Sequence, residues 1–167
     1  DAWARCNPGK IGVAAITVAD DRWAHCNLKV ISLLANILAR QQAVDAGCAE
    51  ALLIRDGFLK EGAASNIFVV KDGVLLAPPK TSFMLPGITY DIVLELAAGH
   101  GQPLEIREIH ENELRAADEV WMTSSTKEVL AITTLDGKPV GDGRPGPAGE
   151  RMWQWYQDFK NTIMRKG

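Results

Sequence analysis

The apolar and polar positions of this chain fall into short strand-like runs separated by a few stretches of helical spacing. A run of apolar and β-branched residues from Ile11 to Val18 (IGVAAITV) predicts a buried strand. From Lys29 to about Ala46 the apolar residues recur at helical spacing, and Gly47 is a suitable residue to end a helix there. The positions that carry this helical period are Ile31, Leu34, Ala35, Leu38 and Gln42.

The clearest hairpin is formed by 65–70 (SNIFVV) and 74–77, because Asp72-Gly73 between them suits a type I′ turn. Further strands are predicted over 49–54, 104–108, 119–123 and 129–135, and further helices over 88–98, 111–116 and 147–165. The last helix places Met152, Trp155 and Phe159 on one face. Strands and helices do not alternate strictly, so we predict a mixed α/β (α+β) fold in which helices flank a curled mixed sheet, and not a doubly wound parallel sheet.

Length and composition narrow the classes of function. The 167 residues suffice for a single core, and a formal net charge of −3 favours neither nucleic acid nor an anionic membrane as a partner. No apolar run reaches the roughly 20 residues that span a bilayer, and no signal segment opens the chain, so we expect a cytoplasmic protein. The three cysteines are widely spaced, and the three histidines lack metal-ligand spacing, so no metal site is predicted.

Lys29 is the first candidate for chemistry. It stands between Leu28 and Val30, where a polar connection meets the predicted apolar helix, so we expect it to point into an interior or a cleft. Burial disfavours the charged form of an amine and makes it a nucleophile, as Schiff-base chemistry requires. The ordinary alternative is a solvated surface lysine.

Three further segments have compositions that suit a ligand. The small residues in 61–66 (EGAASN) permit close backbone approach. The segment 85–89 (LPGIT) opens a predicted helix whose free N–H groups favour phosphate, and the hydroxyls of 123–126 (TSST) follow a strand. Taken singly, each also fits a simple turn.

In this order the segments resemble the fold-type IV pyridoxal-phosphate enzymes, which include D-amino-acid aminotransferase, branched-chain aminotransferase and aminodeoxychorismate lyase. The resemblance extends from about Ile11 to Phe159. Its landmarks are Arg22-Trp23, then 26–29 (CNLK), 61–68, 87–89 and 123–126. The Arg-Trp pair and the Ser65-Asn66 ending are most similar to the D-amino-acid branch. The fold that the resemblance implies is the C-terminal large domain of that family, with its sheet curled into a pseudo-barrel.

The resemblance also implies a role for each matching residue. Lys29 forms the Schiff base with pyridoxal 5′-phosphate and then moves the proton between the substrate Cα and the cofactor C4′. Glu61 lies beside the pyridine nitrogen and keeps it protonated, so that the ring accepts electrons. The residues implied to bind the phosphate are Ile88 (through its backbone N–H), Thr89 and Ser125. Those implied to support the site are Arg22, through an ion pair or hydrogen bonds, and Ser65 and Asn66, which order the loop that carries Glu61.

The family places a smaller N-terminal domain before this one, and the chain shows no counterpart of it. We therefore expect residues 1–10 to be the remnant of an interdomain linker, 11–167 to be the lysine-bearing domain, and the chain to be a fragment that lacks half of the active site. The resemblance also implies a homodimer.

The expected function is transamination between an amino acid, such as D-alanine, and a 2-oxo acid. A branched-chain L-amino-acid aminotransferase and an aminodeoxychorismate lyase use the same lysine and stay open. Asn27, Val30 and Ser32 depart from the residues common in the D-amino-acid branch, which leaves the substrate undecided. From another class, the chain could be a non-catalytic module that kept the fold, and cofactor binding would discriminate between the two.

Overall fold

The computed structural model describes residues 11–164, so the predicted linker remnant at 1–10 lies outside the described residues. The strands are β1 (Val13–Ala19), β2 (Glu50–Arg55), β3 (Phe58–Gly62), β4 (Asn66–Lys71), β5 (Val74–Ala77), β6 (Leu104–Ile106), β7 (Ile109–His110), β8 (Glu119–Ser124), β9 (Glu128–Leu135) and β10 (Lys138–Pro139). The helices are α1 (Leu34–Asp45), α2 (Ile88–Gly99), α3 (Glu111–Arg115) and α4 (Pro147–Phe159), and a π-helical segment, η2 (Lys160–Met164), follows α4.

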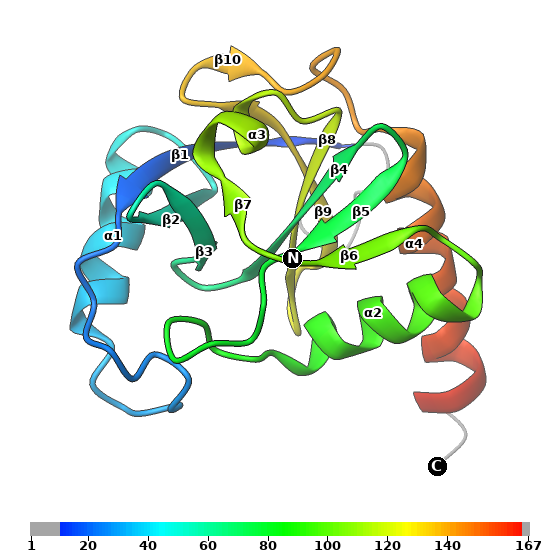
Figure 1. Ribbon diagram of the computed structural model, residues 1–167, viewed down its shortest axis with the longest axis horizontal. Coiled ribbons are helices and arrows are strands. Elements are labelled where there is room, and N and C mark those ends of the chain that lie inside the picture. The colour runs from blue at the N-terminus through cyan, green and yellow to red at the C-terminus, as the bar shows by residue number, and fades with distance from the viewer. Residues whose placement is uncertain (1–10, 165–167) are drawn as a thin grey trace.

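The strands form one mixed sheet in the order β6-β5-β4-β8-β9-β1-β2-β3-β7, and β10 pairs with β9 off this path. The central strand β1 runs parallel to both neighbours, β2 and β9, whereas β4, β8 and β9 pair antiparallel. The sheet curls, with α1 on one flank and α2 and α4 on another (Figure 1). The predicted mixed α/β fold with a curled sheet and flanking helices is confirmed.

Both faces of the central strands are buried, because the curl encloses one face and helices cover the other. In β4, Ile67 and Val69 belong to the cluster inside the curl, and Phe68 and Val70 belong to the cluster under α2 and α4. Successive side chains of a strand point to opposite faces, so each face receives every second residue. This explains why SNIFVV reads as a continuous apolar run and not as an alternating one.

Two helices differ from the expectation. Helix α1 begins at Leu34 and not at Lys29, and it is held to the sheet by the small buried residues Ala39 and Ala43. The β-branched pair Val30-Ile31 has low helix propensity, which favours a non-helical path before Leu34. Helix α4 buries Met152, as predicted, and also Tyr156, whereas Trp155 of the predicted face packs only partly buried against the same cluster.

Candidate functional site

A cavity of about 310 Å³ opens where the loop after β1, the β3–β4 turn, the start of α2 and the end of β8 meet. The structure brings every residue predicted for the site to the wall of this one cavity. They are Arg22, Lys29, Glu61, Ser65, Asn66, Ile88, Thr89 and Ser125.

A buried ion pair stands at one side of the cavity. The Arg22 guanidinium donates through Nη1 to Glu61 Oε1 at 2.6 Å. The same guanidinium donates to both carboxylate oxygens of Asp20, at 2.8 and 3.1 Å, and to the carbonyl of Phe83 at 3.0 Å. Arg22, Asp20 and Glu61 are all buried, so each charge depends on these partners for the solvation that water would supply.

The pKa values of the two carboxylates shift in opposite directions. Burial raises the pKa of Glu61 to about 7, against the lowering effect of the Arg22 guanidinium and the Leu85 N–H. Burial also raises the pKa of Asp20, but hydrogen bonds from Arg22 and Arg55 outweigh that effect and hold the pKa below its ordinary value. Asp20 is therefore the permanent counter-ion of Arg22, and Glu61 is the carboxyl that can gain and lose a proton near neutral pH.

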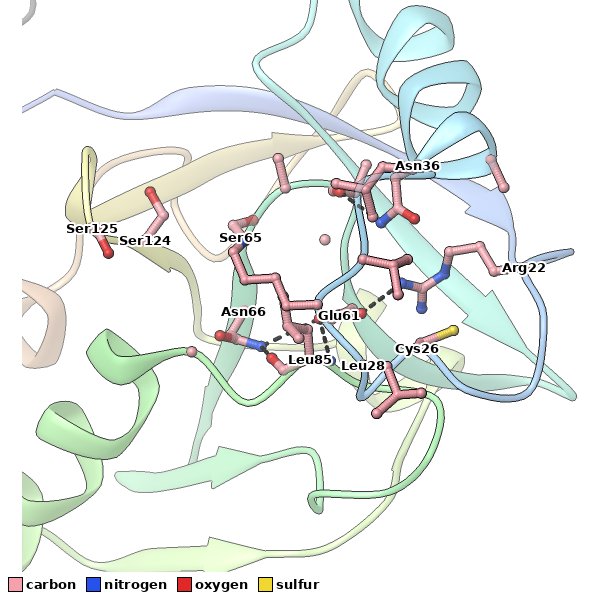
Figure 2. Close-up of a pocket in the computed structure, with 18 of the residues that line it drawn as sticks. Arg22, Cys26, Leu28, Asn36, Glu61, Ser65, Asn66, Leu85, Ser124 and Ser125 are labelled. Carbon is pink, nitrogen blue, oxygen red and sulfur yellow. Dashed lines mark hydrogen bonds and ion pairs between the residues drawn. The ribbon is translucent and has the colours of Figure 1, made fainter.

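Asn66 connects Glu61 to the segment that precedes α2 (Figure 2). Its Nδ2 donates to the Leu85 carbonyl at 2.9 Å and to Glu61 Oε2 at 3.4 Å, and the Leu85 N–H donates to the same oxygen at 3.1 Å. The Ser65 hydroxyl, by contrast, donates to the buried carboxylate of Glu50 at 2.8 Å. A Cβ on Gly87 would lie 2.5 Å from Asn66 Oδ1, so this close approach requires glycine.

The opposite side of the cavity carries hydrogen-bond donors suited to an anion. Helix α2 starts after Gly87, which has no side chain to cap the free N–H groups of the first turn, and the buried Thr89 stands in that turn. Ser124, the last residue of β8, and Ser125, which follows it, lie across the cavity from Arg22 (Figure 2). Uncapped helix N-termini bind phosphate through these N–H groups and the helix dipole.

Lys29 meets the expectation of a cleft position but not that of burial. It lines the cavity, but its side chain is exposed and not buried. The physical reason is the late start of α1: the segment around Lys29 is not helical, and its apolar residues Leu28, Ile31 and Leu33 are exposed and not packed into a core.

The sequence did not point to Asp20 and Arg55 as site residues, and it pointed to Leu85 only as part of the segment 85–89. Arg55 donates to Asp20 at 3.3 Å and to the Arg22 carbonyl at 2.5 Å, and its guanidinium lies 4.3 Å from the centre of the Phe83 ring. Asp20 was detectable in principle, since a carboxylate that directly follows an apolar strand and precedes Arg22 by two residues suits a local ion pair. Arg55 had no local signal, because it reaches the site only through the pairing of β1 with β2.

Among residues 11–164 no group of His, Cys, Asp and Glu side chains has the arrangement of a metal site, and no helix is long and apolar enough to cross a membrane.

Comparison with known proteins identifies the family. Residues 4–135 match the family described as amino-transferase class IV. The chain belongs to this family. It is 44% identical over 136 residues to the D-alanine aminotransferase of Bacillus licheniformis, covering 81% of this chain and 48% of that protein. The chain thus spans about half the length of the curated relatives that it matches.

Solved structures of branched-chain amino acid aminotransferases share the fold. The enzyme from Escherichia coli has a TM-score of 0.75 and 34% identity, covering 86% of this chain and 50% of that one. The T.th. enzyme with pyridoxamine 5′-phosphate has a TM-score of 0.80 and 33% identity, covering 88% and 50%. Of the three relatives named here, the D-alanine aminotransferase has the highest sequence identity, in agreement with the D-amino-acid branch expected above.

Proposed function

We propose that this class IV aminotransferase domain binds pyridoxal 5′-phosphate at Lys29 and serves in the transamination of a D-amino acid, such as D-alanine, with a 2-oxo acid. The observation that carries the proposal is the two-sided cavity, with a buried carboxyl at one side and anion donors at the other. The identity to D-alanine aminotransferases supports the substrate, and the pyridoxamine 5′-phosphate held by a structural relative supports the cofactor.

The residues present fit this cofactor. Pyridoxal phosphate carries its ring nitrogen and its phosphate on different sides of the ring, which matches a cavity with Glu61 on one side and the α2 start with Ser125 on the other. Glu61 would face the ring nitrogen, and Ile88 N–H, Thr89 and Ser125 would hold the phosphate. A volume of about 310 Å³ lies within the size range of cofactor pockets.

When bound, the cofactor supplies an electron sink for the negative charge that develops at the substrate Cα. Lys29 Nζ provides the amine that joins the cofactor and the base that carries the proton at Cα. Glu61 supplies a carboxyl whose raised pKa lets it share a proton with the ring nitrogen. Arg22, itself oriented by Asp20, fixes the position of the Glu61 carboxyl, and Asn66 fixes its second oxygen.

Lys29→Ala tests the lysine assignment. The unmodified chain mixed with pyridoxal phosphate should develop the visible absorbance of lysine-bound cofactor, and borohydride should fix the cofactor to Lys29. The variant should lose both signals, because no other amine would take its place. Lys138→Ala, at an exposed lysine on β10, is the matched control and should leave both unchanged. Retention of the absorbance in Lys29→Ala would contradict the assignment.

Substrate assays separate the competing functions. Enzyme that contains this domain should transfer the amino group of D-alanine to 2-oxoglutarate faster than that of L-leucine. Faster transfer from L-leucine would support the branched-chain function, for which the likeness to the Escherichia coli structure is the favouring observation. Release of product from aminodeoxychorismate would support the lyase. Failure to bind pyridoxal phosphate at all would favour a non-catalytic module.

We also propose that the parent protein carries a small N-terminal domain that completes the active site, that it forms a homodimer, and that it works in the cytoplasm. Support for the dimer comes from α1, where Leu34, Ile37 and Leu38 are each more than half exposed. Monomeric proteins rarely leave contiguous apolar surface of this kind uncovered.

A further inference from the structure

A second cavity, of about 390 Å³, lies between the C-terminal end of α1, the start of β1 and the turn after β8, and it shares no lining residue with the first. Its wall consists of Val13, Ala14, Arg40, Gly47, Cys48, Ala49 and Lys127. The cavity therefore combines two cationic side chains with small apolar residues.

Neither cation is paired within the described residues. Arg40 Nη1 is buried and has no hydrogen-bond partner, and no described carboxylate forms an ion pair with Arg40. The Lys127 ammonium makes only long contacts, at 3.4 Å to the Ala49 carbonyl and 3.9 Å to Met122 Sδ. Buried donors in folded proteins are almost always satisfied, so an orphaned guanidinium nitrogen at a cavity wall indicates a ligand position.

The acid that acts on Lys127, Glu50, forms no ion pair with either cation in the described part of the chain. Glu50 is fully buried, but its carboxylate already accepts hydrogen bonds from the Ser65 hydroxyl at 2.8 Å and from the Ala51 N–H at 3.0 Å. Burial lowers the pKa of Lys127, the charge of Glu50 raises it, and the smaller effect of the Arg40 charge lowers it. The two cations therefore lie close enough to repel each other, and an anion between them would relieve that repulsion.

We propose that this second cavity binds a small organic anion through a carboxylate or phosphate head group held between Arg40 and Lys127. The planar guanidinium presents paired N–H donors that match the oxygens of either group, and the ammonium adds a point charge. Val13, Ala14 and Ala49 offer apolar contact to a short aliphatic body. The site does not depend on the function proposed for the first cavity, because the two cavities share no residue.

Titration followed by amide NMR on this chain tests the site, with inorganic phosphate in one series and butyrate in the other. The amides of Gly47, Cys48, Ala49 and Lys127 should shift saturably with at least one of the two anions, and the preferred anion identifies the head group. Shifts at Ile88 and Thr89 report separately on the first cavity, so failure of one site is distinguishable from failure of the other.

The Kd values of Arg40 and Lys127 variants test which side chains bind the anion. Arg40→Ala should raise the Kd at least tenfold, as expected for loss of a charge-assisted hydrogen bond, and Arg40→Lys should raise it less. Lys127→Met provides an independent test if an Arg40 variant fails to fold. Arg151→Ala, at an exposed arginine of α4, is the matched control and should bind as the unmodified chain does. Absence of shifts, shifts that rise linearly without saturation, or unchanged affinity in both Arg40→Ala and Lys127→Met would overturn the proposal.

Discussion

Glu61 is a buried acid whose carboxylate is hydrogen-bonded by the Arg22 guanidinium, the Leu85 N–H and the Asn66 side chain. Its ion pair with Arg22 is short, yet burial still raises its pKa to about 7. The free energy of removing the carboxylate from water is larger than the stabilisation that its hydrogen-bond partners provide. A carboxyl tuned in this way can exchange a proton with a ligand at neutral pH. The raised pKa of Glu61 also makes the free energy of unfolding depend on pH.

The sign of that consequence follows from proton linkage. The folded state keeps the Glu61 proton up to about pH 7, whereas the unfolded chain releases it near the ordinary value of 4.5. The contribution of Glu61 to the free energy of unfolding is therefore fully present below pH 4.5. It declines as the pH rises towards 7, by at most about 3 kcal/mol. Urea unfolding at pH 5 and pH 8 should show this decline in the unmodified chain and a smaller one in Glu61→Gln.

The exposed residue Glu95 gives the control for that measurement, because Glu95→Gln removes one carboxyl without touching the site. Its pH dependence should equal that of the unmodified chain. An identical decline in Glu61→Gln would show that the Glu61 carboxyl does not titrate in this window.

At the scale of elements, the start of α4 depends on a residue from a strand. Gly146, the N-cap of α4, offers no side chain, and Glu119 of β8 takes that role instead. Its carboxylate accepts from the N–H groups of Ala148 and Gly149, at 2.9 and 2.8 Å, and from Trp121 Nε1 at 2.9 Å. The free N–H groups of the helix are thus satisfied across the α4–β8 contact, which fixes the helix to the sheet.

Glu119→Ala should destabilise the fold by about 1–3 kcal/mol, since it leaves buried donors without an acceptor. Gly146→Ala should also destabilise it, because a Cβ there would lie 2.2 Å from Glu119 Cδ. Gly99→Ala, at the end of α2 where a Cβ meets no atom within 4 Å, is the matched control and should be neutral or slightly stabilising. Equal urea midpoints for Gly146→Ala and Gly99→Ala would contradict this account.

Local signals in the sequence were sufficient where one segment determines its own structure. The Asp72-Gly73 turn is an example, because both residues adopt positive φ, 49° and 78°, as a type I′ turn demands. Partners that are distant in sequence had no such signal: Glu119 reaches α4 across 29 residues. The expected burial of Lys29 was wrong for a third reason, because the apolar residues at helical spacing that follow it belong largely to an exposed helix face and not to a buried one.

For the whole molecule, the exposed face of α1 is an apolar surface that the domain's own core leaves uncovered. Leu34, Ile37 and Leu38 are exposed apolar residues of α1. Helix α1 lies on the flank of the molecule beside β1 and β2 (Figure 1). The proposed homodimer would bury them. The core of the domain needs none of these side chains, because α1 packs on the sheet through Ala39 and Ala43.

Leu38→Glu should therefore shift the protein from dimer to monomer in sedimentation experiments and leave its circular dichroism spectrum unchanged. Gln41→Glu adds the same charge to an exposed polar position of α1, with loss of the exposed Gln41–Asp45 hydrogen bond, and should leave the dimer intact. A monomeric unmodified protein, or equal dissociation constants for the two variants, would argue against α1 as the dimer contact.

The position of β1 in the sheet also determines when the domain can fold. This early strand pairs with β9, and Val13 is aligned with Ile132. A ribosome must therefore synthesise nearly the whole domain before the central strand finds its second neighbour. Non-local parallel pairings of this kind slow folding and leave strand edges exposed meanwhile. We expect the nascent chain to depend on chaperones until β9 has emerged.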